Sequence, residues 1–283
     1  MSDVSGYPLP RLRQMATNFV GGWNKIGTQT AFYASTVRAV GDAIAKYRGE
    51  ILRLIAAMSM GNGALAVIGG TIVIVGFLTL SAGALIAVQG YNLLTGIGTE
   101  ALTGFVSAYI NVRIIAPLVA GIGMAATIGA GATAQLGAMR INEEIDALEV
   151  IGIRSIAYLA STRLLAGVLV VGPLYAVGVL MAFFAARFGP TYIYGQSTGV
   201  YDHYFYTFLN PTDLLWSFFS AIAMAIVVML VHTYYGFTAT GGPAGVGEAV
   251  GRAVRTSLIC VVLVTLMISL SVYGQSGNFH LSG

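Results

Sequence analysis

The feature that most constrains the fold is a long run without charge, because no Asp, Glu, Lys or Arg occurs between residues 54 and 99. Within this run, residues 64–88 are long and apolar enough to cross ~30 Å of hydrocarbon as a helix. Across the whole chain 57% of the residues are hydrophobic and 9% are charged, whereas roughly a quarter are charged in ordinary soluble domains. We therefore expect a polytopic membrane protein, since a soluble core could not bury this much apolar surface.

Four further apolar segments complete the prediction of an all-α membrane protein with five membrane helices. They are residues 114–137, 155–187, 214–237 and 256–273, the last with first turns that begin near Ala249. Arg113 interrupts the stretch before the second span, so residues 100–112 are expected to be a helical or partly re-entrant lead-in. The polar residues 89–99 and the aromatic residues 189–210 are expected to be outer connections.

The distribution of positive charge predicts the orientation. Seven of the fourteen Lys and Arg residues lie in the first 53 positions, and by the positive-inside tendency this places the N-terminus in the cytoplasm and the C-terminus outside. The first ten residues are too polar for a cleavable signal peptide. The predicted parts are a cytoplasmic and interfacial region (1–58), a five-span domain (59–275) and an outer tail (276–283).

The N-terminal region combines charge with periodic apolar positions. One helical stripe is formed by Tyr33, Val37, Val40, Ile44 and Tyr47. Arg38, Asp42 and Lys46 lie off this stripe, which is typical of a helix in the membrane surface whose basic side chains meet anionic headgroups. A cytoplasmic helix packed on its own protein is the alternative.

A short acidic segment separates the second and third predicted spans. It holds four of the eleven acidic residues, namely Glu143, Glu144, Asp146 and Glu149. Asn142 can cap a helix whose first turn is acidic, and Gly152 can end it. Ile141, Ile145 and Leu148 repeat on one side, so the helix is amphipathic with an acidic edge. Spacing alone leaves two interpretations open, a solvated loop helix and a docking surface.

Two rows of small residues run along the second predicted span. The first row is Gly121, Ala125, Gly129, Thr133 and Gly137, and the adjoining row is Ala126, Ala130, Ala134 and Ala138. A helix this narrow on one face lets another backbone approach closely, which is how membrane helices associate. The packing partner is either another helix of this chain or a second subunit.

Several kinds of chemistry are absent from the sequence. It holds no G-x-x-x-x-G-K-[ST] phosphate loop, and the glycines of residues 241–247 are better interpreted as a hinge. His203, His232 and His280 fall in a predicted loop, span and tail, so no catalytic residues are expected, and His232 is either functional or a hydrogen-bonded structural residue. No metal or cofactor site is expected either. Cys260 is the only cysteine, and the cations form no nucleic-acid-binding stripe.

Residues 135–152, with the sequence QLGAMRINEEIDALEVIG, closely resemble the signature of the MlaE/YrbE permeases. These are membrane subunits of ABC transporters that work with Mce proteins to move lipids. Residues 242–247 and the following Arg252-Ala-Val-Arg255 resemble a second family signature, and the likeness extends from about residue 30 to 273. Residues 195–204 resemble the actinobacterial (mycobacterial) YrbE subfamily, particularly its B-type member.

The resemblance implies a non-catalytic permease of the inner (plasma) membrane that moves fatty or mycolic acid-like lipids. A cytoplasmic coupling helix would dock on a separate MceG-like ABC ATPase, which would bind the ATP and Mg²⁺. The coupling residues implied are Asn142, Glu143, Glu144, Asp146, Ala147 and Glu149. The other implied partners are an A-type YrbE permease in a heterodimer, a periplasmic Mce hexamer, and lipid in a cavity between the two permeases.

The chain departs from the family pattern at three positions. Ile114 follows Arg113 where the family often has Arg-Glu, and Thr127 and Gln135 stand where it often has Arg and Glu. These differences suit a heterodimer whose other subunit keeps the charges. Arg113 is the remaining candidate for contacting an acidic lipid group, with a structural role as the alternative. A membrane scaffold that anchors Mce proteins is the second function considered, and an intramembrane enzyme is the third.

Overall fold

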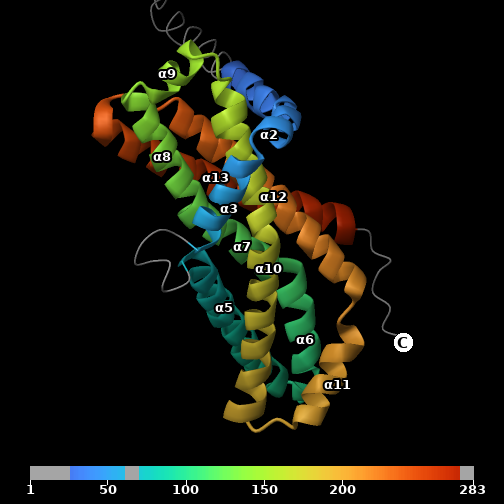
Figure 1. The fold of residues 1–283 in the computed structure, drawn as a ribbon. Helices are drawn as coiled ribbons and strands as arrows, with labels where there is room; N and C mark the ends of the chain where they lie inside the picture. Colours follow the sequence, from blue (N-terminus) through green and yellow to red (C-terminus); the bar gives the residue numbers. More distant parts are fainter. Residues whose placement is uncertain (1–25, 61–69, 275–283) are drawn as a thin grey trace, which may run out of the picture.

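The computed structural model describes residues 26–60 and 70–274, and every regular element in these two stretches is a helix (Figure 1). Five helices of the described chain are long and apolar enough to cross a membrane: Gly70–Thr95, Glu100–Ile141, Ile156–Ile193, Pro211–Phe237 and Gly242–Tyr273. The prediction of an all-α membrane protein with five membrane helices is confirmed. The predicted outer tail at residues 276–283 lies outside the described residues.

The N-terminal region is helical. Residues 26–38 form a first helix, α2 (Val40–Lys46) continues it after a turn at Ala39, and α3 (Arg48–Met60) follows. In Figure 1 these helices lie beside the upper part of the helix bundle, close to the end that carries α9 (Glu144–Val150). They therefore lie next to the acidic segment that the sequence singled out.

One side of the N-terminal helices packs on the third span, and the other side is open. Thr36 and Ala43 are fully buried, and the carbonyl oxygen of Thr36 accepts a hydrogen bond of 2.7 Å from Ser161 Oγ. Val37 and Ile44, from the predicted apolar stripe, are instead 51% and 47% exposed. The region thus contacts its own protein and also presents an apolar side, and its place in the membrane surface stays a prediction.

The first span is α5 (Gly70–Thr95), which packs along the third span. The predicted residues 64–69 lie outside the described residues, and the helix runs on to Thr95, so the outer turn is confined to residues 96–99. A Cβ on Gly83 would lie 2.5 Å from the carbonyl oxygen of Ala182. Glycine is therefore required here by the close approach of the two backbones.

The second span is longer than predicted. Its successive segments are the 3₁₀ turn Glu100–Leu102, α6 (Thr103–Ile110), the π-helical Asn111–Ile115, α7 (Ala116–Met124), the π-helical Ala125–Gly129 and α8 (Ala130–Ile141). Residues 100–112 are helical, as one of the two forms predicted for the lead-in, but the predicted interruption at Arg113 was wrong, since one helix runs from Glu100 to Ile141. The backbone stays helical through Arg113, because a π-helical turn accommodates the residue and an acidic side chain balances its charge.

The third span, Ile156–Ile193, includes α10 (Thr162–Phe188) and extends beyond the predicted end at residue 187. It begins with a π-helical segment, Ile156–Ser161, and ends with another, Gly189–Ile193. Pro173 lies inside α10 without ending it, as membrane helices tolerate when neighbouring groups satisfy the freed carbonyl.

The predicted outer loop at residues 189–210 is largely helical instead. Its main element, α11 (Thr198–Phe208), packs on α6, and Tyr201 and Phe205 are 0% and 7% exposed. A Cβ on Gly104 would lie 2.4 Å from the carbonyl oxygen of Tyr201. Two aromatic residues of this expected connection, Tyr201 and Phe205, therefore hold α11 against the bundle.

The last two spans, α12 (Pro211–Phe237) and α13 (Gly242–Tyr273), are antiparallel neighbours joined by a short turn. Gly241 and Gly242 have φ values of +90° and +68°, which side chains rarely adopt. The remaining glycines of residues 241–247 are helical, so the expected hinge is reduced to these two positions. The prediction that the fifth span begins near Ala249 or Thr256 was wrong, because its helix already begins at Gly242.

The first row of small residues faces α12 and α13 of the same chain. A Cβ on Gly121 would lie 2.8 Å from Met224 Sδ, and one on Gly137 would lie 2.8 Å from Val246 Cγ1. Ala125 and Thr133, also in this row, are fully buried. In the adjoining row the exposed members are Ala126, Ala134 and Ala138. The first row therefore packs inside the chain, whereas most of the adjoining row lies on the exposed surface.

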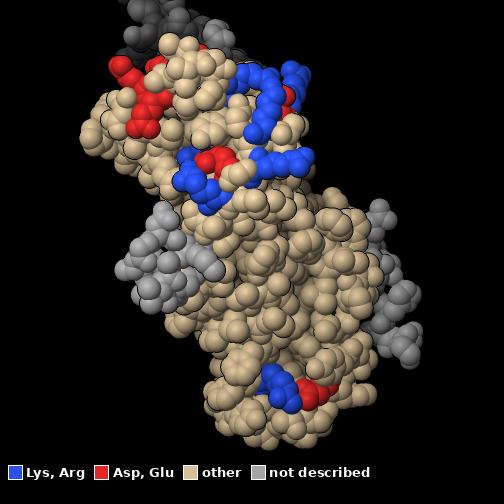
Figure 2. Space-filling model, viewed as in Figure 1, with Lys and Arg blue, Asp and Glu red and all other residues tan. Residues whose placement is uncertain are grey.

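Charged side chains gather at one end of the molecule (Figure 2). In this view Lys, Arg, Asp and Glu cluster at the end with α2 and α9, and the middle of the surface carries no charge. At the opposite end Arg187 Nε lies 2.8 Å from Oδ1 of Asp202 on α11. The uncharged zone matches the part of the helices that a bilayer would cover.

Candidate functional site

The short acidic helix α9 (Glu144–Val150) follows directly after the second span. Glu143 precedes it with φ 61°, a left-handed conformation that is uncommon for a side chain other than glycine. Asn142 is the C-cap residue that follows α8, and α9 has no side-chain cap. The prediction that Asn142 caps the acidic helix was wrong, because the chain reverses at Glu143 and not one residue earlier.

The C-terminal end of α9 lies at Gly152, as the sequence predicts. Gly152 has φ 82°, a conformation that favours glycine after a helix. The amide of Gly152 donates to the carbonyl oxygen of Glu149 at 3.0 Å, and the amide of Ile153 donates to that of Leu148 at 2.9 Å. These bonds satisfy carbonyl groups that the helix end would leave open.

The apolar side of α9 is fixed to the ends of the neighbouring spans. Ile145 is 1% exposed and forms a cluster with Leu136 of α8 and Leu159 of the third span, with Leu148 packed beside it. Burying one such side chain stabilises the packed state by about 1.5–3 kcal/mol. α9 is therefore in direct side-chain contact with the ends of both spans.

The opposite side of α9 is open to a partner. The six residues implied as coupling residues are all exposed: Asn142, Glu143, Glu144, Asp146, Ala147 and Glu149. Arg140 Nη1 lies 2.6 Å from Asp146 Oδ1, and the hydroxyl of Ser155 donates to the carboxylate of Glu149. These contacts hold two of the carboxylates in place and leave the acidic surface accessible.

Two apolar residues at the tip of α9 were missed by the sequence analysis. Val150 and Ile151 are 87% and 70% exposed, although the other large residues of this segment pack on the spans. Their exposure could have been predicted from the sequence, because both residues fall outside the apolar stripe of Ile145 and Leu148. These two adjacent exposed side chains, next to the acidic run, are available as apolar anchors for a protein contact.

Arg113, the candidate lipid contact, forms an ion pair inside the chain. Its Nε and Nη2 donate to Oδ2 of Asp213 at 3.1 and 2.8 Å, and its guanidinium carbon lies 4.0 Å from the ring centre of Tyr109 and 4.2 Å from that of Tyr273. The group thus links the second, fourth and fifth spans. This arrangement favours the structural alternative for Arg113.

His232 on α12 is also held by hydrogen bonds. Its Nδ1 lies 2.7 Å from the hydroxyl of Thr133, and its Nε2 lies 3.1 Å from that of Ser257 on α13. The ring is fully buried, and it occupies the space that a Cβ on Gly129 would need, 2.5 Å from His232 Cδ2. His232 therefore connects three spans, as the structural alternative predicts.

Comparison with known proteins places this architecture in a family. A family model for the permease MlaE matches residues 60–271. The chain is 25% identical over 196 residues to a probable ABC transporter permease protein of Rickettsia bellii, which covers 69% of this chain and 76% of that protein. It is 24% identical over 181 residues to a probable ABC transporter permease protein of Synechocystis, with 64% and 69% covered.

A plant relative is similar to a comparable extent. The chain is 25% identical over 191 residues to the chloroplastic protein TRIGALACTOSYLDIACYLGLYCEROL 1 of Arabidopsis thaliana, which covers 68% of this chain and 55% of that protein. The matched residues of the family model include the first four helices that are able to span a membrane and the fifth up to residue 271. The chain therefore belongs to the MlaE permease family and is a membrane permease of the ABC-transporter type.

Proposed function

We propose that this chain is one membrane subunit of an ATP-driven lipid transporter of the Mce type, and that α9 docks on its separate ATPase. The observation that carries the proposal is the two-sided character of α9. Its acidic side and its apolar tip are exposed, whereas Ile145 is buried between the ends of the second and third spans. Docking on the exposed side would move both spans together.

The transported substrate is proposed to be a lipid with fatty or mycolic acid-like chains. The Arabidopsis relative carries the name of a galactolipid, which supports a lipid as the substrate class. The resemblance of residues 135–152 to the MlaE/YrbE signature supports the same class. ATP and Mg²⁺ are assigned to the partner ATPase, and the permease itself is proposed to supply no catalytic group.

The proposed assembly has two permease subunits, an A-type YrbE and this B-type chain, below a periplasmic Mce hexamer. The exposed small residues of the second span support a close contact with a second permease. They are Gly131, Ala134 and Ala138 of α8, with Gln135 beside them, and Ala126 of the preceding π-helical segment. The charged end with α9 is assigned to the cytoplasm, because basic residues concentrate on the inner side of membrane proteins.

The test is a charge reversal on α9, with Glu144→Lys and Asp146→Lys combined in one variant. We expect loss of ATPase co-purification and of labelled-lipid uptake, because like charges in a docked interface cost several kcal/mol. Insertion into the membrane should persist, since both residues are exposed. The matched control is Glu248→Lys, an exposed acidic residue on α13 that pairs with Arg252 at 2.7 Å.

The scaffold alternative gives a different result in the same experiment. A scaffold without a transport path would keep the Mce proteins, and the reversal would change neither ATPase recovery nor uptake. Retention of the ATPase together with normal lipid uptake in the reversed variant would contradict the coupling role of α9. Loss of the variant from the membrane would indicate that the segment is required for folding instead.

A further inference from the structure

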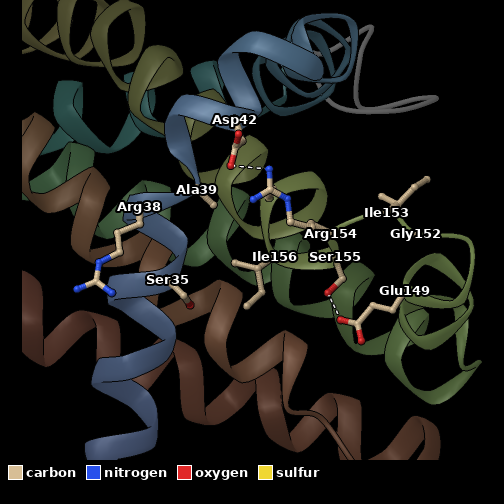
Figure 3. Close-up of a pocket in the computed structure, with 11 residues that line it drawn as sticks. Ser35, Arg38, Ala39, Asp42, Glu149, Gly152, Ile153, Arg154, Ser155 and Ile156 are labelled. Atoms are coloured by element: carbon tan, nitrogen blue, oxygen red, sulfur yellow. Dashed lines mark hydrogen bonds and ion pairs between the residues drawn. The ribbon is translucent and has the colours of Figure 1, made fainter.

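Several polar side chains at the charged end of the molecule have partners within the chain. In the cavity of about 550 Å³ between the N-terminal helices and the segment after α9, Asp42 and Arg154 form an ion pair of 2.7 Å (Figure 3). In the same cavity Ser155 donates a hydrogen bond to Glu149. The end opposite to α9, where α6 and α11 lie side by side (Figure 1), is different. Buried polar atoms there have no hydrogen-bond partner among the described residues.

Three side chains at this opposite end carry the unpartnered atoms. Ser107 on α6, Asn111 directly after it and Tyr201 on α11 are each 0% exposed. The atoms are the two hydroxyl oxygens and both Oδ1 and Nδ2 of the Asn111 amide. Buried polar groups of native proteins almost always have a hydrogen-bond partner, because an unpaired one loses its interaction with water and gains nothing in return. These four atoms therefore need a partner.

Spacing and packing place the three side chains in one region. Positions 104, 107, 108 and 111 lie on one side of a helix, since they are three or four residues apart. This side faces α11, because a Cβ on Gly104 would lie 2.4 Å from the carbonyl oxygen of Tyr201, and Ala108 packs in one cluster with Tyr201. Ser107 and Asn111 are therefore neighbours on the side of the second span that α11 covers.

The hydroxyls of Ser107 and Tyr201 lie near each other without a direct hydrogen bond. Burial raises the pKa of the Tyr201 phenol to about 12, and the neighbouring hydroxyl of Ser107 opposes this rise. The phenol is therefore neutral at neutral pH, and it both donates and accepts hydrogen bonds. Neither hydroxyl has a partner of hydrogen-bond geometry among the described residues. A small polar molecule between the two hydroxyls would satisfy both.

A water molecule matches the four atoms in number and in kind. Water donates two hydrogen bonds and accepts two. It can donate to Asn111 Oδ1 and to one hydroxyl oxygen, and it can accept from Asn111 Nδ2 and from the other hydroxyl. Buried waters typically make about three hydrogen bonds, with a range of roughly two to four, to polar groups that lack other partners. None of the three side chains is charged, so the site offers nothing to balance an anion.

We propose that Ser107, Asn111 and Tyr201 form an internal water site that joins the second span to α11. The water takes the place of direct hydrogen bonds between the two elements. Close by on the same span, the hydroxyl of Ser217 on α12 donates to the carbonyl oxygen of Val112 at 2.6 Å, so this π-helical part of the span is held by polar contacts on a second side. The inference rests on neither lipid transport nor the docking of α9.

The first experiment is radiolytic hydroxyl-radical labelling of the purified permease, in complex with its partner subunit where one co-purifies, with a readout by mass spectrometry. The beam produces radicals from water, so a fully buried side chain is oxidised only where a water lies against it. We expect oxidation of Tyr201 above the unirradiated sample. Met124 and Met229 are internal references, because both are 0% exposed in the apolar core. Oxidation of Tyr201 no greater than that of these methionines would overturn the proposal.

Asn111→Leu distinguishes a hydrated site from a dry one by the sign of its effect. In a hydrated site it removes two partners of the water, so oxidation of Tyr201 should disappear and the melting temperature should fall by a few degrees. In a dry site it removes unpaired polar atoms whose burial is unfavourable, so the melting temperature should rise. A rise would contradict the proposal. A fall that leaves the oxidation of Tyr201 unchanged would assign the effect to packing and would contradict it as well.

Ser107→Ala is the milder variant, because it leaves the Asn111 amide and the Tyr201 hydroxyl in place. Oxidation of Tyr201 should persist, and the water should exchange faster with ¹⁸O-labelled solvent that is mixed in before irradiation. The matched control is Thr79→Val, since Thr79 is also fully buried but its hydroxyl donates to the carbonyl oxygen of Val75 at 2.9 Å. Oxidation of Tyr201 that rises in this control as stability falls would report opening of the fold, and would refute a bound water.

A salt series separates water from an alkali cation, which oxygen atoms also bind. Melting curves are recorded in sodium, potassium and choline chloride at equal ionic strength. A water site predicts the same melting temperature in all three salts. A higher melting temperature in one alkali salt, lost in Asn111→Leu, would identify a cation as the ligand and would overturn the water.

Discussion

Arg113 and Asp213 are a hundred positions apart in sequence, and their side chains are joined at 2.8 Å between Nη2 and Oδ2. The two side chains are only 14% and 16% exposed. Because the pair joins the second span to the start of α12, it acts on a part of the bundle that is far from α9. This relationship separates a structural role of Arg113 from the lipid-contact role that the sequence suggested.

Asp213→Asn should destabilise the fold. It leaves the largely buried charge of Arg113 without its carboxylate, at a cost of about 3 kcal/mol, and the melting temperature in detergent should fall. The double variant Arg113→Leu with Asp213→Leu should recover part of the loss, because it removes both charges together. An unchanged melting temperature with lost lipid uptake would instead support a lipid contact at Arg113.

Gly129→Ala should be harmful because of one neighbouring ring. The new Cβ would lie 2.5 Å from Cδ2 of His232 and 2.7 Å from its Nε2, and overpacking of this kind costs about 1–3 kcal/mol. Thermal unfolding of the purified permease measures the effect. Gly131→Ala is the control, because a Cβ there meets nothing within 4 Å.

The pairing of Gly129 with His232 is tested by a double variant. If the ring is the obstacle, Gly129→Ala should cost less in a His232→Ala background than in the wild type. Strict additivity of the two substitutions would contradict this explanation. An equal loss of melting temperature in Gly131→Ala would mean that any added methyl group disturbs this helix, whatever lies opposite to it.

Val150→Ser combined with Ile151→Ser should weaken ATPase docking without harming the fold. Both side chains are exposed, so the melting temperature should change little, as for most surface substitutions, which fall within about ±0.5 kcal/mol. ATPase co-purification should be lost, because buried apolar anchors dominate protein contacts. Full ATPase recovery would assign docking to the acidic residues alone.

The ion pair at the α11 end should make stability depend on pH. The hydrogen bonds from Arg187 lower the pKa of Asp202 below its ordinary value of 3.8. Because the folded-state pKa is the lower one, the stabilisation is present above pH 3.8 and is lost as the pH falls through the folded-state pKa. Melting curves of the wild type and of Asp202→Asn should therefore differ at neutral pH and converge below that range.

The outcome of the Asp202 experiment depends on the whole pH profile. Since the pair is partly exposed, the difference between the two proteins should be small and should shrink in high salt. A difference that persists unchanged at pH 2 would show that Asp202 stabilises α11 through packing and not through its charge. Arg252→Gln, which breaks a comparable exposed pair on α13, should leave the α11 end unaffected.

The sequence predicts the membrane helices well and their ends poorly. The apolar runs locate all five spans, because about twenty apolar residues are needed to cross hydrocarbon whatever the tertiary packing. The ends of the helices depend on contacts with other segments of the chain, which the sequence of one segment does not reveal. Arg113 looks like a break until Asp213 is placed beside it, and residues 189–210 look like a loop until α11 packs on Gly104.

The α9 segment shows the same limit at closer range. Its acidic pattern and Gly152 locate the helix, and its apolar stripe identifies Ile145 as the buried residue. The left-handed conformation of Glu143 has no signal in the sequence, because such a conformation is uncommon for this residue type. The exposed Val150 and Ile151 were missed because their exposure depends on where the neighbouring spans end.

The two π-helical segments of the second span, Asn111–Ile115 and Ala125–Gly129, change what kinds of sequence variation this span can absorb. A π-helical turn holds one residue more than an α-helical turn, and it confines that extra residue to a single turn. Removing one residue there would restore α-helical geometry, and the side chains of the flanking turns would still point toward the same neighbours. Elsewhere in the span a single deletion would rotate every later side chain by roughly 100°. Relatives one residue shorter at these two places should therefore retain the same helix packing.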